Sequence, residues 1–200
     1  KPADAGTKTV LDIVGCGRPF PGHELAVVDE DGKPLGERRV GQVITKGPSV
    51  TAGYFENEEA TRECFKEGWL YTGDLGYLAE GELFICGRVK DLIIIRGANH
   101  YPQDIEWVVG DIEGVRRGNV VAFSVMKDGT EELVIAAECG SQDAPALREA
   151  IPAKVVEEFA LTPSHVALVP VGALPKTSSG KAQRRRSKAM FESGELAEHP

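Results

Sequence analysis

The stretch that organises this sequence is Gly87-Arg88-Val89-Lys90-Asp91-Leu92-Ile93-Ile94-Ile95-Arg96-Gly97. It follows a strand-like apolar segment that ends at Cys86, and it contains a second apolar segment that begins at Leu92. The charged residue Lys90 lies between these two runs, where a chain passing from one domain to another would be exposed. A chain of 200 residues suits one or two domains, and the pattern that follows Lys90 predicts a small α+β domain that begins near Asp91.

The two predicted domains differ in their secondary-structure patterns. The first reads mainly as β-strands separated by Gly and Pro turns, whereas the second alternates between strands and helices. The predicted strands are 24–28, 42–45, 83–86, 92–95, 120–125, 133–137 and 166–169, and the predicted helices begin at Asn57, at Pro102, at Ala144 and after Lys181. The pattern predicts an α+β fold in which a β-rich part precedes a small α+β domain.

Composition and charge argue against several functional classes. A net charge of −8 argues against general nucleic-acid binding. No apolar run approaches the roughly 20 residues of a membrane-spanning helix, so we expect no membrane span. The four cysteines form no metal-ligand pair, and no secretory segment is visible. We therefore predict free thiols, no metal site within this chain and a cytoplasmic location.

A loop near the end of the chain, Pro175-Lys176-Thr177-Ser178-Ser179-Gly180-Lys181, combines small residues with a lysine. Such a loop is mobile by composition, and the compact ammonium of Lys181 suits a phosphate or carboxylate oxygen. A phosphate-binding P-loop is excluded, because Pro175 stands where that motif needs glycine and Ala182 where it needs Ser or Thr. The remaining alternative is a solvated lysine in a surface turn.

A second polar cluster, Tyr71-Thr72-Gly73-Asp74, ends an aromatic-rich segment. A carboxylate has about four lone-pair sites, so Asp74 can accept hydrogen bonds from both hydroxyls of a ribose cis-diol. The simpler interpretation is a turn aspartate that caps its own backbone. Arg88, which follows Gly87, also has a simpler interpretation, as a plain surface arginine.

These three motifs, in this order and at these separations, resemble signature motifs of the adenylate-forming enzymes. That superfamily includes acyl-CoA synthetases, luciferase-like ligases, nonribosomal adenylation domains and fatty acyl-AMP ligases. The resemblance covers most of the chain, from about Gly15 to Lys188. It implies that residues 1–90 form the last, barrel-like subdomain of a large adenylation domain and that residues 91–200 form a mobile C-terminal domain.

The resemblance also implies roles for individual residues. Asp74 would hold the ribose of AMP, Arg88 would reach its ribose and phosphate side, and Lys181 would be catalytic at the α-phosphate. Lys90 would be the hinge between the domains, and Gly97 would lie where the acceptor thiol enters. ATP and Mg²⁺ are the implied cofactors, with the metal ligands expected outside this chain.

One segment indicates a branch of the superfamily. The order Gly97-Ala98-Asn99-His100-Tyr101-Pro102-Gln103-Asp104-Ile105-Glu106 looks like the fatty acyl-AMP ligases. These enzymes pass a fatty acyl group to an acyl carrier protein or a polyketide synthase carrier domain. An acyl-CoA ligase, with coenzyme A as the acceptor, is the alternative. A non-catalytic carrier-docking or regulatory module is a third interpretation, against which the intact Asp74, Arg88 and Lys181 argue.

Two further expectations concern what surrounds these motifs. The family's upstream phosphate-gripping loop and acyl pocket are not recognisable in this sequence, so we expect the C-terminal part of a longer enzyme that is inactive alone. A basic segment comprises Lys181, Arg184, Arg185, Arg186 and Lys188. It is open to interpretation as a nucleic-acid contact, as an ordinary basic helix, or as a surface that attracts an acidic carrier protein.

Overall fold

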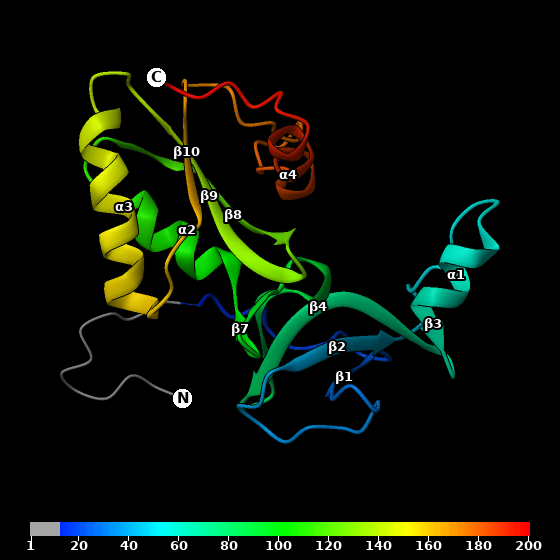
Figure 1. Ribbon diagram of the computed structural model, residues 1–200. Helices are drawn as coiled ribbons and strands as arrows, with labels where there is room; N and C mark the ends of the chain where they lie inside the picture. The colour runs from blue at the N-terminus through cyan, green and yellow to red at the C-terminus, as the bar shows by residue number, and fades with distance from the viewer. Residues whose placement is uncertain (1–12) are drawn as a thin grey trace. The chain divides into compact units, whose positions relative to one another are not determined.

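The computed structural model describes residues 13–200, which divide into two compact units. One unit ends at Lys90 and the other spans Asp91–Pro200. Both combine strands with helices, and the strands of the first unit form a curved antiparallel sheet (Figure 1). The predicted α+β fold with a barrel-like β-rich part is therefore confirmed.

The first unit is built on a five-stranded sheet in the order β1-β2-β4-β3, with β5 paired to β4. Its elements are β1 (Glu24–Val28), β2 (Gly41–Lys46), α1 (Glu58–Cys64), β3 (Phe65–Lys66), β4 (Trp69–Ala79) and β5 (Glu82–Arg88). The register shifts between Leu75 and Gly76, and such a bulge bends a strand and increases its twist. Only glycine fits at position 76, because a β-carbon there would lie 2.5 Å from the Phe84 carbonyl oxygen.

The second unit is built on a three-stranded sheet in the order β10-β9-β8. Strand β9 runs antiparallel to β8 and parallel to β10, and α3 provides the crossover that a parallel pair requires. A short hairpin of β6 and β7 precedes this sheet. The elements are η1 (Val89–Asp91), β6 (Ile93–Ile95), β7 (Ala98–His100), α2 (Pro102–Gly110), β8 (Val115–Lys127), β9 (Thr130–Cys139), α3 (Ala144–Phe159), β10 (His165–Val169) and α4 (Arg184–Glu192).

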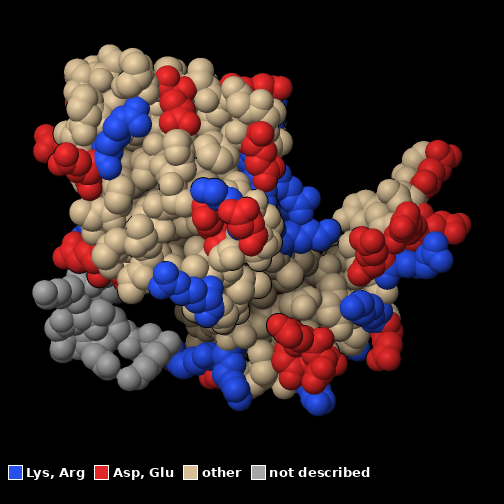
Figure 2. Space-filling model, viewed as in Figure 1, with Lys and Arg blue, Asp and Glu red and all other residues tan. Residues whose placement is uncertain are grey.

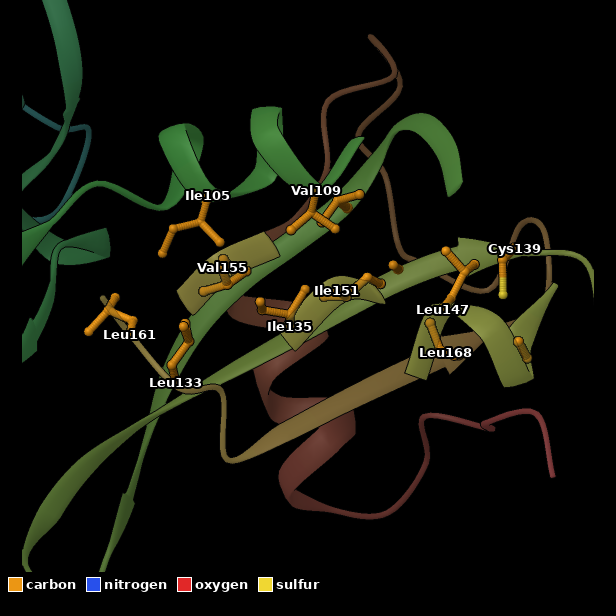
Figure 3. Close-up of a cluster of buried hydrophobic side chains, with 14 of the residues drawn as sticks. Ile105, Val109, Leu133, Ile135, Cys139, Leu147, Ile151, Val155, Leu161 and Leu168 are labelled. Atoms are coloured by element: carbon orange, nitrogen blue, oxygen red, sulfur yellow. The ribbon is translucent and has the colours of Figure 1, made fainter. Parts of the chain in front are cut away.

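Both faces of the three-stranded sheet are covered, which explains why β9 is buried from Leu133 to Cys139 and apolar without interruption from Leu133 to Ala137. Side chains of α2 and α3 pack against one face (Figure 3). That cluster includes Ile105, Val109, Leu133, Ile135, Leu147, Ile151, Val155 and Leu168. Leu174, Met190, Phe191 and Leu196 cover the other face, so the segment that carries α4 is fixed to the sheet by its own apolar contacts.

Within residues 13–200, no helix is both long enough and apolar enough to cross a membrane.

Candidate functional site

Asp74 and Arg88 lie directly opposite each other on neighbouring strands of the first unit. They are register partners across the β4–β5 pair, and Arg88 Nε donates a hydrogen bond of 2.8 Å to Asp74 Oδ1. The Asp74 side chain is 30% exposed and the Arg88 side chain 63%. Because a carboxylate has about four lone-pair sites, the contact with Arg88 leaves Asp74 acceptor capacity for a diol.

Thr72 and Gly73 set the direction of Asp74. The Thr72 hydroxyl donates to the Val43 carbonyl oxygen at 2.9 Å and accepts the Asp74 backbone N–H at 3.1 Å. Gly73 has a φ of 77°, a left-handed conformation that glycine adopts without strain. The backbone N–H of Asp74 is thus bonded to Thr72, and the Asp74 carboxylate is bonded to Arg88. This arrangement does not favour the interpretation of Asp74 as a turn residue that caps its own backbone.

The Lys181 loop, residues 175–181, is closed into a tight turn. Thr177 N–H donates to the Lys181 carbonyl oxygen at 2.8 Å, and Lys181 N–H donates back to Thr177 Oγ1 at 3.1 Å. Gly180 N–H donates to the Thr177 carbonyl oxygen, with a Gly180 φ of 82°. Lys181 lies at the end of this turn and is exposed. Its ammonium is thereby presented to solvent on a hydrogen-bonded backbone.

The basic segment divides into two kinds of residue. The Arg184 side chain is only 17% exposed and is paired with Glu106 and Asp91 of the same unit. Arg185 and Arg186 are exposed on α4. Arg184 is therefore bound internally and adds nothing to a surface that attracts a partner. Figure 2 shows that basic and acidic side chains are interspersed on the visible face.

Glu106 is one of the two largely enclosed carboxylates that pair with Arg184. Its Oε1 atom accepts the Ala122 backbone N–H at 2.9 Å and contacts Arg184 as well. Burial raises the pKa of Glu106, while the neighbouring Arg184 guanidinium pulls that pKa back down. Glu106 is part of the quoted branch segment, but the sequence did not indicate that it pairs with Arg184.

Lys90 and Gly97 lie in short connections. Lys90 is exposed in the 3₁₀ turn η1. Arg96 and Gly97 form the two-residue turn of the β6–β7 hairpin, with φ values of 54° and 77°. Positive φ at both positions is the backbone of a type I′ turn, in which glycine is favoured. A β-carbon at Gly97 would meet no atom within 4 Å, so the outer side of this turn is open.

Metal ligands do not gather in the described part of the chain. Among residues 13–200, no group of three or more His, Cys, Asp or Glu side chains could hold a metal ion. The prediction that magnesium ligands lie elsewhere stays a prediction.

Comparison with known proteins supplies the family. Residues 90–199 match the family model described as "Disco-interacting protein 2-like, AMP domain". The chain belongs to these AMP domains of the adenylate-forming (ANL) superfamily. The resemblance to this superfamily that the three motifs carry is therefore confirmed.

Relatives and solved structures of adenylate-forming proteins match far more of the chain. A Caulobacter vibrioides protein whose name assigns it to the acyl-CoA synthetases is 41% identical over 96% of this chain and 34% of its own length. The medium-chain-fatty-acid–[acyl-carrier-protein] ligase JamA of Moorena producens is 38% identical over 94% of this chain and 34% of its own. The structure of McyG A-PCP complexed with phenylalanyl-adenylate superposes with a TM-score of 0.83 at 39% identity, over 92% of this chain and 34% of that one. This chain thus spans about a third of the length of the relatives it matches.

Proposed function

We propose that this chain provides part of an ATP-dependent fatty acyl-AMP ligase, which adenylates a fatty acid and passes the acyl group to a phosphopantetheine thiol of a carrier protein. The observation that carries the proposal is the Asp74–Arg88 pair, a carboxylate and a guanidinium held in register at 2.8 Å. Membership of the superfamily, together with a relative that matches 96% of the chain, supports assigning this pair to a nucleotide. We also propose a cytoplasmic location, which rests on the sequence.

Asp74 and Arg88 are assigned to the nucleoside. Asp74 accepts hydrogen bonds from the ribose hydroxyls, and Arg88 contributes positive charge on the ribose and phosphate side. Hydrogen bonds to a charged group are stronger than neutral ones. Because Arg88 already orients the Asp74 carboxylate, less side-chain entropy is lost when the ribose binds. The similar McyG A-PCP structure is a complex with phenylalanyl-adenylate, which supports an adenine nucleotide as the ligand.

Lys181 is assigned to the first half-reaction. A fatty acid carboxylate oxygen attacks the α-phosphorus of ATP, a new oxygen–phosphorus bond forms, and the bond to pyrophosphate breaks. Negative charge builds on the α-phosphate during this step, and the Lys181 ammonium stabilises it. Mg²⁺ would neutralise phosphate charge, through ligands outside this chain.

The second half-reaction is assigned to another orientation of the second unit. Rotation about Lys90 withdraws Lys181 and presents the turn at Gly97 to the incoming thiol. The thiol sulfur attacks the acyl carbon, AMP leaves with the electrons of the acyl–oxygen bond, and the thiol proton passes to the released phosphate or to solvent. The exposed position of Lys90 in a three-residue 3₁₀ turn supports this assignment, since hinges are short segments that absorb backbone rotation.

The acceptor separates this proposal from its alternative. JamA carries a name that specifies an acyl carrier protein, and the segment from Gly97 to Glu106 supports the same branch. The Caulobacter relative carries an acyl-CoA synthetase name, which keeps coenzyme A as the alternative acceptor. A non-catalytic carrier-docking module is the other alternative, and the ordered Asp74–Arg88 pair argues against it.

The test uses the full-length protein. Fatty-acid-dependent exchange of pyrophosphate into ATP measures adenylation. Incubation with fatty acid and ATP, and then with either coenzyme A or a phosphopantetheinylated carrier protein, identifies the acceptor. The proposal expects acyl-AMP release with coenzyme A and acyl-carrier formation with the carrier. Efficient acyl-CoA formation would favour the alternative ligase, and absence of exchange with every fatty acid tested would favour the docking module.

A further inference from the structure

The Arg184 side chain is largely buried, and its guanidinium forms ion pairs with two carboxylates of the second unit. Nη2 donates to both oxygens of Glu106 at 2.9 Å, and Nη1 donates to Asp91 Oδ2. The three side chains are each less than one-fifth exposed. A guanidinium bonded to two carboxylates is fixed in both position and plane, which a lysine ammonium would not be.

Only a short stretch of chain joins Arg184 to Lys181. Gln183, immediately before Arg184, joins the end of the Lys181 loop to its start through two hydrogen bonds. Its N–H donates to the Pro175 carbonyl oxygen at 2.9 Å, and its side-chain amide donates to the Lys176 carbonyl oxygen at 2.6 Å. A displacement of Arg184 is therefore passed to Lys181 through a backbone that has little freedom to absorb it.

The start of the Lys181 loop is also bonded to a carboxylate. The backbone N–H of Leu174, just before the loop, donates to Glu138 Oε1 at 3.1 Å. Glu138 is fully buried in β9, and its second oxygen accepts from Arg116 at 2.8 Å. Each end of the loop is thus connected to an ion pair: Leu174 to the Glu138–Arg116 pair, and Arg184 to Glu106 and Asp91. Both ends of the turn are therefore fixed in position.

Stability alone does not account for an enclosed cluster of one arginine and two acids. Replacing a buried ion pair by well-packed apolar side chains is often neutral or stabilising. Geometry accounts for it better, because the cluster joins the start of α4 to Asp91 and Asp91 directly follows Lys90.

We propose that Arg184 is a positioning residue for Lys181. It ties the root of the Lys181 loop to Asp91 and to Glu106 of α2, so that the loop turns together with the first residue of the second unit and does not pivot on its own. The inference rests on the proposed function, since Arg184 has this task only if Lys181 acts on the nucleotide. Arg184 itself contacts no substrate.

The first test compares two conservative variants of the full-length protein. Arg184→Lys keeps the charge, so neither carboxylate is left facing an apolar side chain, but it removes the planar fork. Arg186→Lys makes the same change at an exposed position of the same helix and is the matched control. We expect Arg184→Lys to lower kcat for adenylation by about 10- to 100-fold, because small misplacements of a reacting group are costly. The KM for ATP and acyl transfer from synthetic acyl-adenylate should stay close to those of the parent, and Arg186→Lys should resemble the parent throughout.

A double variant separates positioning from general stability. In a Lys181→Ala background there is no ammonium to position, so adding Arg184→Lys should lower adenylation no further. A residue that only stabilises the unit would lower it again by the same factor. Amide hydrogen exchange over residues 177–181 gives a readout that does not depend on activity, and Arg184→Lys should accelerate it.

Each outcome bears on one proposal. If Lys181→Ala impairs adenylation but Arg184→Lys does not, the positioning role is wrong and the proposed function stands. If Lys181→Ala leaves adenylation intact, the proposed function fails first. If Arg184→Lys lowers both half-reactions equally together with the thermal midpoint, Arg184 is a structural residue and the inference is overturned.

Discussion

Arg88 Nε lies 2.8 Å from Asp74 Oδ1, and the two residues are register partners on antiparallel strands. An ion pair this exposed contributes no more than about 1 kcal/mol to folding, and many contribute nothing measurable. Its disruption should therefore be visible in nucleotide binding and leave thermal unfolding nearly unchanged. This separation lets the assignment of Asp74 be tested without confusing a binding defect with a folding defect.

Asp74→Ala in the full-length protein should weaken binding of both ATP and acyl-adenylate. The ribose hydroxyls lose a charged acceptor, and a hydrogen bond to a charged group contributes roughly 1.5–3 kcal/mol. Isothermal titration measures both affinities. Glu80→Ala is a suitable control, because Glu80 is the exposed partner of Arg38 in the same unit. If the variant discriminates against deoxy-ATP as strongly as the parent does, Asp74 does not hold the ribose.

Lys181→Ala should impair adenylation and spare acyl transfer. Removing one preorganised group aimed at developing charge typically lowers the rate by about 100- to 1000-fold. Pyrophosphate exchange measures the first half-reaction, and thioester formation from synthetic acyl-adenylate measures the second. Lys176→Ala removes an exposed lysine from the same loop and should retain both activities. Equal loss of the two half-reactions in Lys181→Ala would contradict the assignment.

Lys90→Pro should spare adenylation and impair acyl transfer, which is the reverse of the result expected for Lys181→Ala. Proline fixes φ near −65°, so the connection loses the rotational freedom that a hinge requires. An enzyme held in the adenylating orientation would form acyl-adenylate and fail to transfer the acyl group. Lys90→Ala removes the side chain but keeps the backbone freedom, and it should transfer normally. Transfer by Lys90→Pro at the parent rate would exclude a hinge at this position.

His100 predicts a pH effect on stability. Burial lowers the pKa of His100 below its ordinary value of 6.5, so the unfolded chain binds a proton more readily than the folded one. The contribution of neutral His100 to the free energy of unfolding is fully present above about pH 6.5, and it is lost as the pH falls through the pKa of His100 in the folded state. Thermal unfolding between about pH 8 and about pH 5 should show a smaller loss for His100→Gln than for the parent.

Asp104 also titrates with a shifted pKa, so the effect of His100 has to be measured as the difference between His100→Gln and the parent. Burial raises its pKa, and a raised carboxyl pKa changes stability with pH in the direction opposite to that of His100. The parent curve alone is a sum of such contributions. An identical pH dependence in His100→Gln and the parent would show that His100 does not contribute.

Local sequence signals predicted most secondary-structure elements. The residue pair Asp128-Gly129 joins β8 to β9 with two positive φ values, as a turn signal between two apolar runs indicates. Asn57 caps α1 through its side chain, which accepts the Ala60 N–H at 3.0 Å. Such signals are readable because the residues that interact are neighbours in the chain. The two-residue strand β3 was not predicted, since it is too short to show a pattern.

The sequence by itself determined the superfamily, the α+β fold and the chemistry available at Asp74, Arg88 and Lys181, because motif order and residue type are properties of the chain alone. Only the tertiary structure decided that Asp74 faces Arg88, since a strand register places one residue opposite another and a one-residue slip would turn each side chain to the other face. It also decided that Arg184 is an internal ion-pair partner, whereas Arg185 and Arg186 beside it are exposed. Arg184 and Glu106 are separated by 78 positions, so their contact depends on how α2 and α4 pack against the sheet, which no local pattern records.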